Sequence, residues 1–179
     1  EKDRLMRAYT RALVPDSARM VIGPLKDVPA PDMGTDAADM FSMRDEYGRI
    51  THDPMAPAIV TGKPEGDGGS KGRKQATGLG VFLATVSALE IIGEELGIGK
   101  DIKGRTVAVQ AYGNVGGYAA RIFHRAGAKV QAIKEADGIL YNEDGIDVDM
   151  LDMHLYRIGG KFSDFEGARL ITPDEFWKL

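Results

Sequence analysis

The chain has 179 residues, enough for one domain with a hydrophobic core or for one domain and part of another. Hydrophobic residues make up 43% and charged residues 28%, a balance typical of a globular protein and not of a disordered one. The net charge of -4 argues against a protein that binds nucleic acid or an anionic membrane. The sequence has no cysteine, which excludes a disulfide, a thiolate nucleophile and a cysteine-ligated metal.

No apolar run reaches the ~20 residues that a membrane helix needs, and the charged, amphipathic opening does not resemble a signal peptide. We therefore expect a cytoplasmic protein with neither a membrane nor a nucleic acid as partner. The first residue is not methionine and lies inside a helical pattern, so we expect the sequence to be a piece of a longer chain.

The first part of the chain is predicted to hold two helices joined by a stiff loop. Residues 1–13 have a helical period, with an apolar stripe that consists of Leu5, Ala8, Tyr9, Ala12 and Leu13. An apolar strand is expected from residue 20, and the prolines that follow it, Pro24, Pro29 and Pro31, restrict the loop. Thr35 or Asp36 then caps a helix that runs to about residue 47.

A long, polar, glycine-rich loop begins at residue 52 and is predicted to contain a short strand at residues 58–61. Long loops in compact domains are commonly functional, and this one lacks the repeats of a disordered segment. A helix over residues 76–96 follows it, with apolar residues at helical spacing.

The second part of the chain alternates strand, helix and strand. A strand around Val107 and Val109, a helix from Val115 and a strand over residues 130–133 predict a βαβ unit with a parallel sheet. Beyond it we expect a helix at 147–159, a short strand at 168–172 and a last helical turn at 173–179.

A dinucleotide-binding fingerprint, G-x-G-x-x-G, lies between the predicted strand and helix. The segment reads Ala111, Tyr112, Gly113, Asn114, Val115 and Gly116, with alanine at the first glycine position. Gly113 would let the backbone approach a pyrophosphate, and Gly116 would let the helix pack closely on the strand. Alanine at position 111 is tolerable at negative φ and unfavourable at positive φ, so a plain strand-turn-helix stays open as the alternative.

Glu135 follows the next strand at the place where an acidic residue binds ribose hydroxyls. A carboxylate accepts hydrogen bonds from a 2′-hydroxyl and repels a 2′-phosphate, which favours NAD over NADP. Lys134 beside it weakens that preference.

Asp32 lies in the proline-rich loop, where it could act as a general acid/base or form an ordinary Asx turn or helix cap. The cations of the glycine-rich loop could bind phosphate or carboxylate or simply be solvated; they are Lys63, Lys71, Arg73 and Lys74. The three histidines lie on separate elements without ligand spacing, so no metal site is proposed.

Three motifs together resemble the amino-acid dehydrogenases of the glutamate dehydrogenase type. They are "IGPLKDVPAPDMGT", "VTGKPEGDGGSKGRKQATGLGV" and "VAVQAYGNVGGYAA", in this order and at similar spacing, and "YNEDGIDV" fits too. The resemblance covers nearly all of the chain and implies a partial Rossmann-like, parallel-sheet NAD(P)-binding domain after the end of an α/β substrate-binding domain. It places the substrate-binding and dimerisation part at residues 1–72 and the hinge helix with the cofactor domain at 73–179.

The resemblance also implies an activity, the reversible oxidative deamination of L-glutamate to 2-oxoglutarate and ammonia with NAD or NADP. Asp32 matches the catalytic aspartate, and Arg73 and Thr77 match positions near the nicotinamide. Gly113, Asn114 and Val115 match the pyrophosphate loop, and Glu135 matches the ribose acid. Lys63 is a candidate on the substrate side, and all residues of the fingerprint, 111–116, are candidates for cofactor binding. The family implies a homo-oligomer, usually a hexamer.

Two alternatives remain on the sequence alone. Asp36 stands where the family usually has asparagine, and a carboxylate near the substrate disfavours a dicarboxylate, which favours a dehydrogenase for a neutral amino acid. The family's lysine-bearing segments precede the Asp32 loop and are not in this sequence, so a non-catalytic nucleotide-binding fragment or regulatory subunit is the second alternative.

Overall fold

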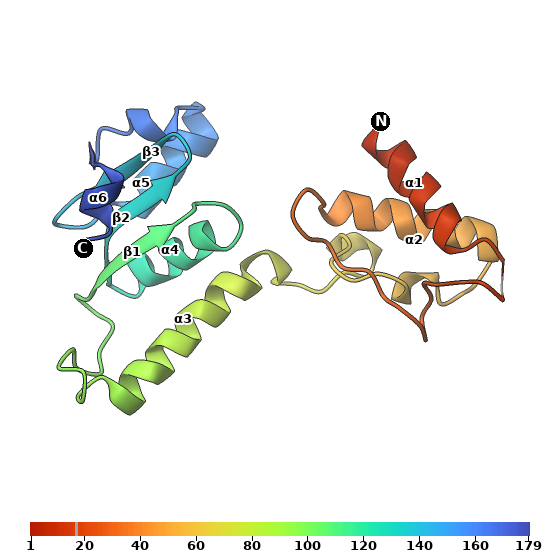
Figure 1. Ribbon diagram of the computed structural model, residues 1–179, viewed down its shortest axis with the longest axis horizontal. Helices are drawn as coiled ribbons and strands as arrows, with labels where there is room; N and C mark the ends of the chain where they lie inside the picture. The colour runs from red at the N-terminus through yellow and green to blue at the C-terminus, as the bar shows by residue number, and fades with distance from the viewer. Residues whose placement is uncertain (17) are drawn as a thin grey trace. The chain divides into compact units, whose positions relative to one another are not determined.

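The computed structural model describes residues 1–16 and 18–179 and divides into two compact units, Glu1–Arg73 and Lys74–Leu179. Each unit has its own hydrophobic core. Figure 1 shows the helices and strands of both units.

The first unit contains two helices and a set of tight loops. Helix α1 spans Lys2–Leu13 and α2 spans Ala37–Thr51, and single 3-10 turns follow at Ala56–Ala58 and Glu65–Asp67. The core is built from α2 and from loop residues, and it consists of Val14, Ile22, Met40, Met43, Tyr47, Ala56, Ile59 and Val60.

Two strands were predicted in this unit, one from residue 20 and one at residues 58–61, and both predictions are wrong. The apolar run from residue 20 forms one isolated bridge, between Ile22 and Asp27, and residues 58–61 begin at the last residue of the 3-10 turn Ala56–Ala58 and form no strand. The prolines explain the first case, because they remove backbone donors that a ladder needs. Ile22, Ile59 and Val60 are buried in the core all the same, whereas Val21 is exposed.

Most of the expected apolar stripe of α1 does not face the core, and Leu13 is the exception. Leu5 and Tyr9 are exposed, whereas Thr10 is fully buried and Met6 and Leu13 pack on the core cluster. Helix α1 is oriented by polar contacts with α2 instead. These include the Lys2 ammonium 2.5 Å from an Asp39 carboxylate oxygen, and the Ser42 hydroxyl, which donates to the Asp3 carboxylate over 2.6 Å.

Glu46 is the centre of the contact between α1 and α2. Its side chain is 2% exposed, and Arg11 and Arg49 each place a guanidinium nitrogen 2.6 Å from the same carboxylate oxygen. Arg7 lies 3.6 Å from the other oxygen. The hydrogen bond from Arg49, with a smaller contribution from Arg11, lowers the pKa of Glu46 to about 2 although burial opposes it.

The second unit contains a four-stranded sheet in the order β1-β2-β3-β4. The strands are β1 (Thr106–Gln110), β2 (Lys129–Glu135), β3 (Gly138–Tyr141) and β4 (Arg169–Leu170). β1 and β2 are parallel and are connected by α4 (Gly116–Arg125), which confirms the predicted βαβ unit. β2 pairs antiparallel with β3, and β3 antiparallel with β4, so the sheet is mixed and not parallel throughout.

The remaining helices cover the sheet from two sides. Residues of α4 and of α5 (Val148–Asp152) share one core cluster, and Phe176 of α6 (Pro173–Phe176) joins a second cluster with Ala132 and Ile139. A π-helical stretch, Met153–Ile158, continues α5, and a 3-10 turn lies at Phe162–Asp164.

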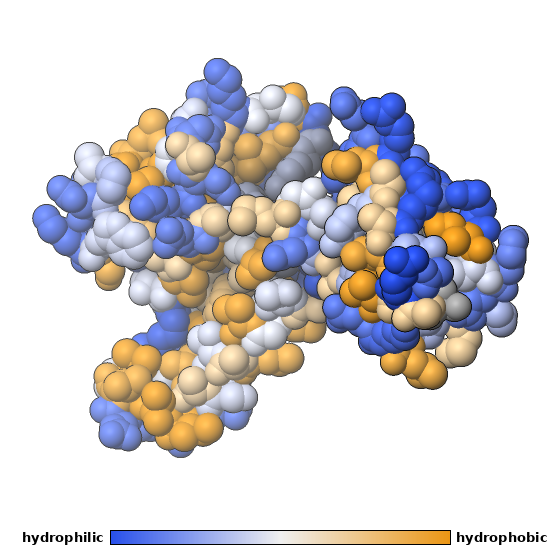
Figure 2. Space-filling model, turned by 45° about the vertical axis from the view of Figure 1, so that its right-hand side comes forward, coloured by the Kyte–Doolittle hydropathy of each residue, from blue (hydrophilic) through white to orange (hydrophobic). Residues whose placement is uncertain are grey.

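Helix α3 (Arg73–Ile92) begins at the last residue of the first unit, and all its other residues belong to the second. It packs on α4 at Gly78, where an added Cβ would lie 2.7 Å from the amide of Ala119, and through a T-shaped pair of Phe82 and Phe123. Much of its surface is left open, and hydrophobic side chains gather over its far end and the turns after it (Figure 2).

Within the described residues, α3 is long and apolar enough to cross a membrane by length and composition only, with 11% of its apolar window buried. The expectation that no segment reaches membrane length therefore does not hold for α3. Core helices of soluble proteins have the same composition, so the helix alone does not indicate a membrane protein.

Replacing Glu46 by glutamine removes the charge that the arginines contact. We expect the free energy of unfolding at neutral pH to fall by about 3 kcal/mol, measured by urea denaturation followed by circular dichroism. Because folding lowers the pKa of Glu46 from 4.5 to about 2, its stabilisation is complete above pH 4.5 and is lost as the pH falls toward 2. The E46Q variant lacks that acid-dependent loss.

The matched control is Asp16→Asn, which removes an exposed carboxylate paired with Arg19. Exposed pairs contribute little, so this variant should unfold like the wild type. Equal destabilisation by both variants would contradict the role given to Glu46.

Candidate functional site

The fingerprint segment lies where β1 ends and α4 begins. The amide of Ala111 donates to the carbonyl of Lys134 over 2.8 Å, so the β1–β2 ladder continues one residue into the turn. Ala111 has a φ of 68° and is one of two non-glycine residues with positive φ in the described chain, the other being His52. The alanine therefore occupies the left-handed conformation that a glycine would adopt more readily.

Gly113 and Gly116 differ in whether the fold has room for a side chain. A Cβ at Gly116 would overlap the carbonyl oxygen of Ala111, so glycine is required there by the fold itself. A Cβ at Gly113 would meet nothing within 4 Å, and Gly113 is not in the left-handed region. The fold does not need glycine at 113, and the space beside it is open.

The backbone amides of residues 113–116 donate no hydrogen bond to any group that the structure describes. They lie at the N-terminus of α4, a ten-residue helix, where the helix dipole adds partial positive charge. Four free donors beside open space form a cradle suited to an anion such as a phosphate.

Glu135, the last residue of β2, reaches this turn. One oxygen of its carboxylate accepts from the amide of Tyr112, and the other accepts from the amide of Ala136 over 3.1 Å. Lys134 is engaged elsewhere, since its ammonium lies 5.0 Å from the ring centre of Trp177 and 5.7 Å from that of Phe176. The charge beside the cradle is therefore acidic at Glu135, and Lys134 is held by aromatic rings.

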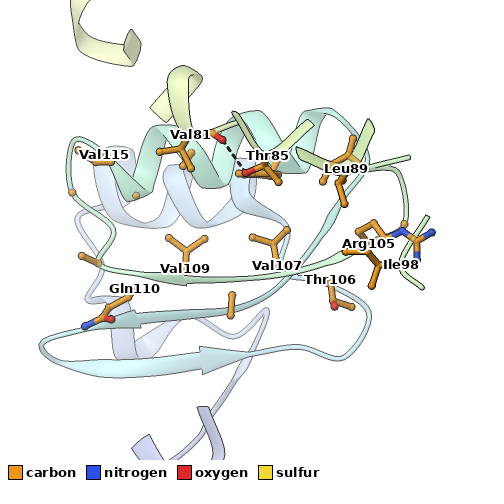
Figure 3. A pocket seen from close by; sticks show the side chains of 18 of the residues that line it. Val81, Thr85, Leu89, Ile98, Arg105, Thr106, Val107, Val109, Gln110 and Val115 are labelled. Atoms are coloured by element: carbon orange, nitrogen blue, oxygen red, sulfur yellow. Dashed lines mark hydrogen bonds between the residues drawn. The ribbon is translucent and has the colours of Figure 1, made fainter. Parts of the chain in front are cut away.

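A cavity of about 920 Å³ begins at the fingerprint and runs between α3 and β1. Val81, Thr85 and Leu89 line it from α3, and Val107 and Val109 line it from β1 (Figure 3). β1 is an edge strand of the sheet, so its free side forms part of the cavity wall. The cavity thus has a polar end at the fingerprint amides and an apolar remainder.

The Asp32 loop in the first unit is held by its own backbone. The amide of Thr35 donates to the Asp32 carbonyl over 2.9 Å, and the Thr35 hydroxyl also bonds the backbone of Asp32. The exposed carboxylate of Asp32 has no hydrogen bond or ion pair with any residue the structure describes, so the Asx turn and helix cap are not seen.

A second loop lies against the first. The amide of Thr61 donates to the carbonyl of Pro29 over 2.9 Å, and a Cβ on Gly62 would contact Pro31. The ammonium of Lys63, next in the chain, donates to the carbonyl of Val60 over 3.0 Å. Residues 29–32 and 61–63 are therefore neighbours within this unit.

Asp36 is the N-cap of α2. Its carboxylate accepts from the amides of Ala38 and Asp39 over 2.8 and 3.2 Å, and the Asp39 carboxylate accepts from the amide of Asp36 in return. Asparagine at this position could accept the same hydrogen bonds. The aspartate thus has a structural role.

Arg73 and Thr77 lie in the first turns of α3 with exposed side chains. Thr77 precedes Gly78, the residue that packs on the beginning of α4, so it lies near the N-terminal end of that helix. Among the described residues no group of His, Cys, Asp or Glu could hold a metal ion.

Comparisons with known proteins cover both units. Residues 68–179 match the family model described as Glutamate/Leucine/Phenylalanine/Valine dehydrogenase, and residues 1–49 match the Glu/Leu/Phe/Val dehydrogenase dimerisation domain. The chain is 43% identical over 175 residues to a mitochondrial glutamate dehydrogenase of Dictyostelium discoideum, covering 96% of this chain and 34% of the relative. It is 45% identical over 151 residues to a cryptic catabolic NAD-specific glutamate dehydrogenase of Bacillus subtilis, covering 84% and 33%.

The chain also resembles solved structures of glutamate dehydrogenases. The hetero-hexameric glutamate dehydrogenase from Thermus thermophilus, in a Leu-bound form, superposes with a TM-score of 0.79 at 34% identity over 99% of this chain and 38% of its own. Glutamate dehydrogenase from Peptoniphilus asaccharolyticus superposes with a TM-score of 0.66 at 34% identity, over 88% and 38%. The chain spans about a third of the length of the curated relatives.

Ala111→Gly should stabilise the second unit by up to about 1 kcal/mol, because glycine adopts a φ of 68° without strain. The change is measured as a rise in the urea midpoint of unfolding. The control, Ala88→Gly, makes the same substitution at an exposed site within α3 and should destabilise by about 1 kcal/mol. Equal losses at both sites would mean that Ala111 is not strained.

Proposed function

The chain belongs to the glutamate/leucine/phenylalanine/valine dehydrogenase family, and from that premise we propose that it is the central part of a glutamate dehydrogenase. The reaction is the reversible oxidative deamination of L-glutamate to 2-oxoglutarate and ammonia with NAD(P). In this proposal residues 1–72 end the substrate-binding and dimerisation domain, and residues 73–179 form the hinge helix and part of the Rossmann-like cofactor domain.

The anion cradle at the start of α4 is the observation that carries the proposal. Its free amides and the open space at Gly113 fit the pyrophosphate of a dinucleotide. When bound, the nicotinamide supplies the hydride chemistry. The chain's own task there is to bind the phosphates with the amides of residues 113–116 and to orient the adenosine ribose at Glu135.

We propose NAD as the preferred cofactor. Glu135 presents a carboxylate beside the cradle, where it would accept from ribose hydroxyls and repel a 2′-phosphate. Lys134 would not offset that repulsion while its ammonium lies over the rings of Phe176 and Trp177. The Bacillus subtilis relative is described as NAD-specific.

Asp32 is proposed as the group that takes a proton from the substrate amino group and returns it. Its carboxylate is exposed, unpaired within the described residues and carried by a loop that prolines and Thr35 restrict. Lys63, on the adjacent loop, is proposed to face the substrate, and Arg73 and Thr77 to lie near the nicotinamide end.

Glutamate is preferred to a neutral amino acid as the proposed substrate. The sequence argument for a neutral substrate depended on Asp36, and the carboxylate of Asp36 is engaged with the amides of Ala38 and Asp39 at the N-cap of α2. The curated relatives are glutamate dehydrogenases. A homohexamer in the cytoplasm is the expected state; a regulatory subunit is the alternative, since one structural neighbour is hetero-hexameric.

The test of the activity is glutamate-dependent reduction of NAD by the full-length protein, with leucine as the competing substrate. We expect faster turnover with glutamate, and Asp32→Asn should lower kcat at least about 100-fold with little change in cofactor affinity. Asp27→Asn, in the same loop, is the control and should leave kcat unchanged. Faster turnover with leucine than with glutamate would contradict glutamate as the substrate. Cofactor binding without turnover of either amino acid would favour the non-catalytic subunit.

The cradle is tested separately by fluorescence titration with NADH and NADPH. Gly113→Ala should weaken NADH binding at least about tenfold and leave the unfolding midpoint unchanged, because the new methyl occupies the space proposed for phosphate. Gly116→Ala should lower the unfolding midpoint, because the methyl overlaps Ala111. Full NADH affinity in G113A would rule out this phosphate position.

A further inference from the structure

The side chain of Tyr112 points into the protein although the residue lies in the middle of the fingerprint. It is 4% exposed, and its ring packs near Phe162 with 6.1 Å between ring centres. The phenol donates a hydrogen bond to the Asp152 carboxylate over 3.0 Å, at the end of α5. A residue of the loop is therefore fixed to an element 40 positions away in the chain.

Asp152 is itself held in place by Arg121 of α4. The guanidinium donates to both carboxylate oxygens, one contact being 2.7 Å long. The same guanidinium lies over three aromatic rings, with 4.9 Å to the ring centre of Tyr118, 5.7 Å to Tyr112 and 5.8 Å to Tyr156. Arg121 and Asp152 together give the Tyr112 phenol an acceptor with a defined position.

The phenol stays protonated and able to donate throughout the physiological pH range. Burial raises the pKa of Tyr112 well above its ordinary value, and the neighbouring Asp152 charge raises it further. The hydrogen bond to Asp152 also raises the pKa of Arg121 above its usual range, so the ion pair persists under the same conditions.

The backbone of Tyr112 is fixed as well, because its amide donates to Glu135. Tyr112 is thus anchored at both its side chain and its main chain, between the left-handed Ala111 and the open Gly113. No other residue of the 111–116 segment has a side-chain hydrogen bond in the part of the chain that the structure describes. The position of the Gly113 amide follows from this anchor.

We propose that Tyr112, through Asp152 and Arg121, is a positioning residue that holds the fingerprint loop in its phosphate-binding conformation before the cofactor arrives. This inference rests on the proposed cofactor site. A loop that is already ordered loses less conformational freedom on binding, so the anchor raises the affinity for the dinucleotide without touching it.

The test compares the full-length wild type with Tyr112→Phe and Tyr156→Phe. Tyr112→Phe removes only the phenol oxygen and keeps the buried ring, so the protein should fold. Tyr156→Phe removes the same atom from another ring beside Arg121, one that is 66% exposed and has no hydrogen bond to residues 111–116 in the part of the chain that the structure describes. The two variants separate an effect on the loop from a general effect on the aromatic cluster.

Two readouts are expected to change in Tyr112→Phe and to stay at wild-type values in Tyr156→Phe. The dissociation constant for NADH should rise about threefold to tenfold, with kcat at saturating cofactor nearly unchanged. In the cofactor-free protein, hydrogen exchange of the amides of residues 111–117 should accelerate while that of β2 stays the same.

The outcomes distinguish this inference from the proposed function. No saturable NADH binding by the wild type would overturn the cofactor site itself. Wild-type binding with unchanged affinity and exchange in Tyr112→Phe would overturn the positioning role alone. Equal losses in both variants, or a loss of kcat with unchanged cofactor affinity, would also overturn it.

Discussion

The close approach of α4 to the end of β1 is the constraint on which the rest of the second unit depends. A side chain at Gly116 would overlap the carbonyl of Ala111, so this contact exists only because that position has none. The approach sets the direction of α4 and therefore of its free N-terminal amides. It also forces the turn to bend sharply, and Ala111 accepts a left-handed conformation as a result.

The elements that sequence patterns predicted best are those whose signals are local. β1, α4 and β2 follow from alternating and helical periods within about thirty residues, and Asp36 marks the start of α2 by its capping chemistry. The prediction of a strand from residue 20 was wrong, because apolar residues indicate that a segment is buried but not that its backbone pairs with another strand. β3 was missed because a four-residue strand in a tight hairpin has almost no periodicity to detect.

The same distinction applies to the candidate site. The fingerprint and Glu135 could be located from spacing, because strand, turn and helix follow one another in the chain. Asp152 and Arg121 could not, because Asp152 meets Tyr112 across 40 positions and Arg121 across 31, and a lone Asp or Arg carries no local signal. The outward face of α1 was also unpredictable, since ion pairs with α2 and not its apolar stripe decide its orientation.

The free edge of β1 has a consequence for what can pair with this sheet. The backbone groups on this edge line the cavity between α3 and β1, close to the apolar side chains of α3 (Figure 3). Such an edge is a template for any extended segment that reaches it, including the same strand of another copy, and it favours aggregation. β1, with five residues, is the longer of the two edge strands of this sheet and therefore the place where a further strand would pair most readily.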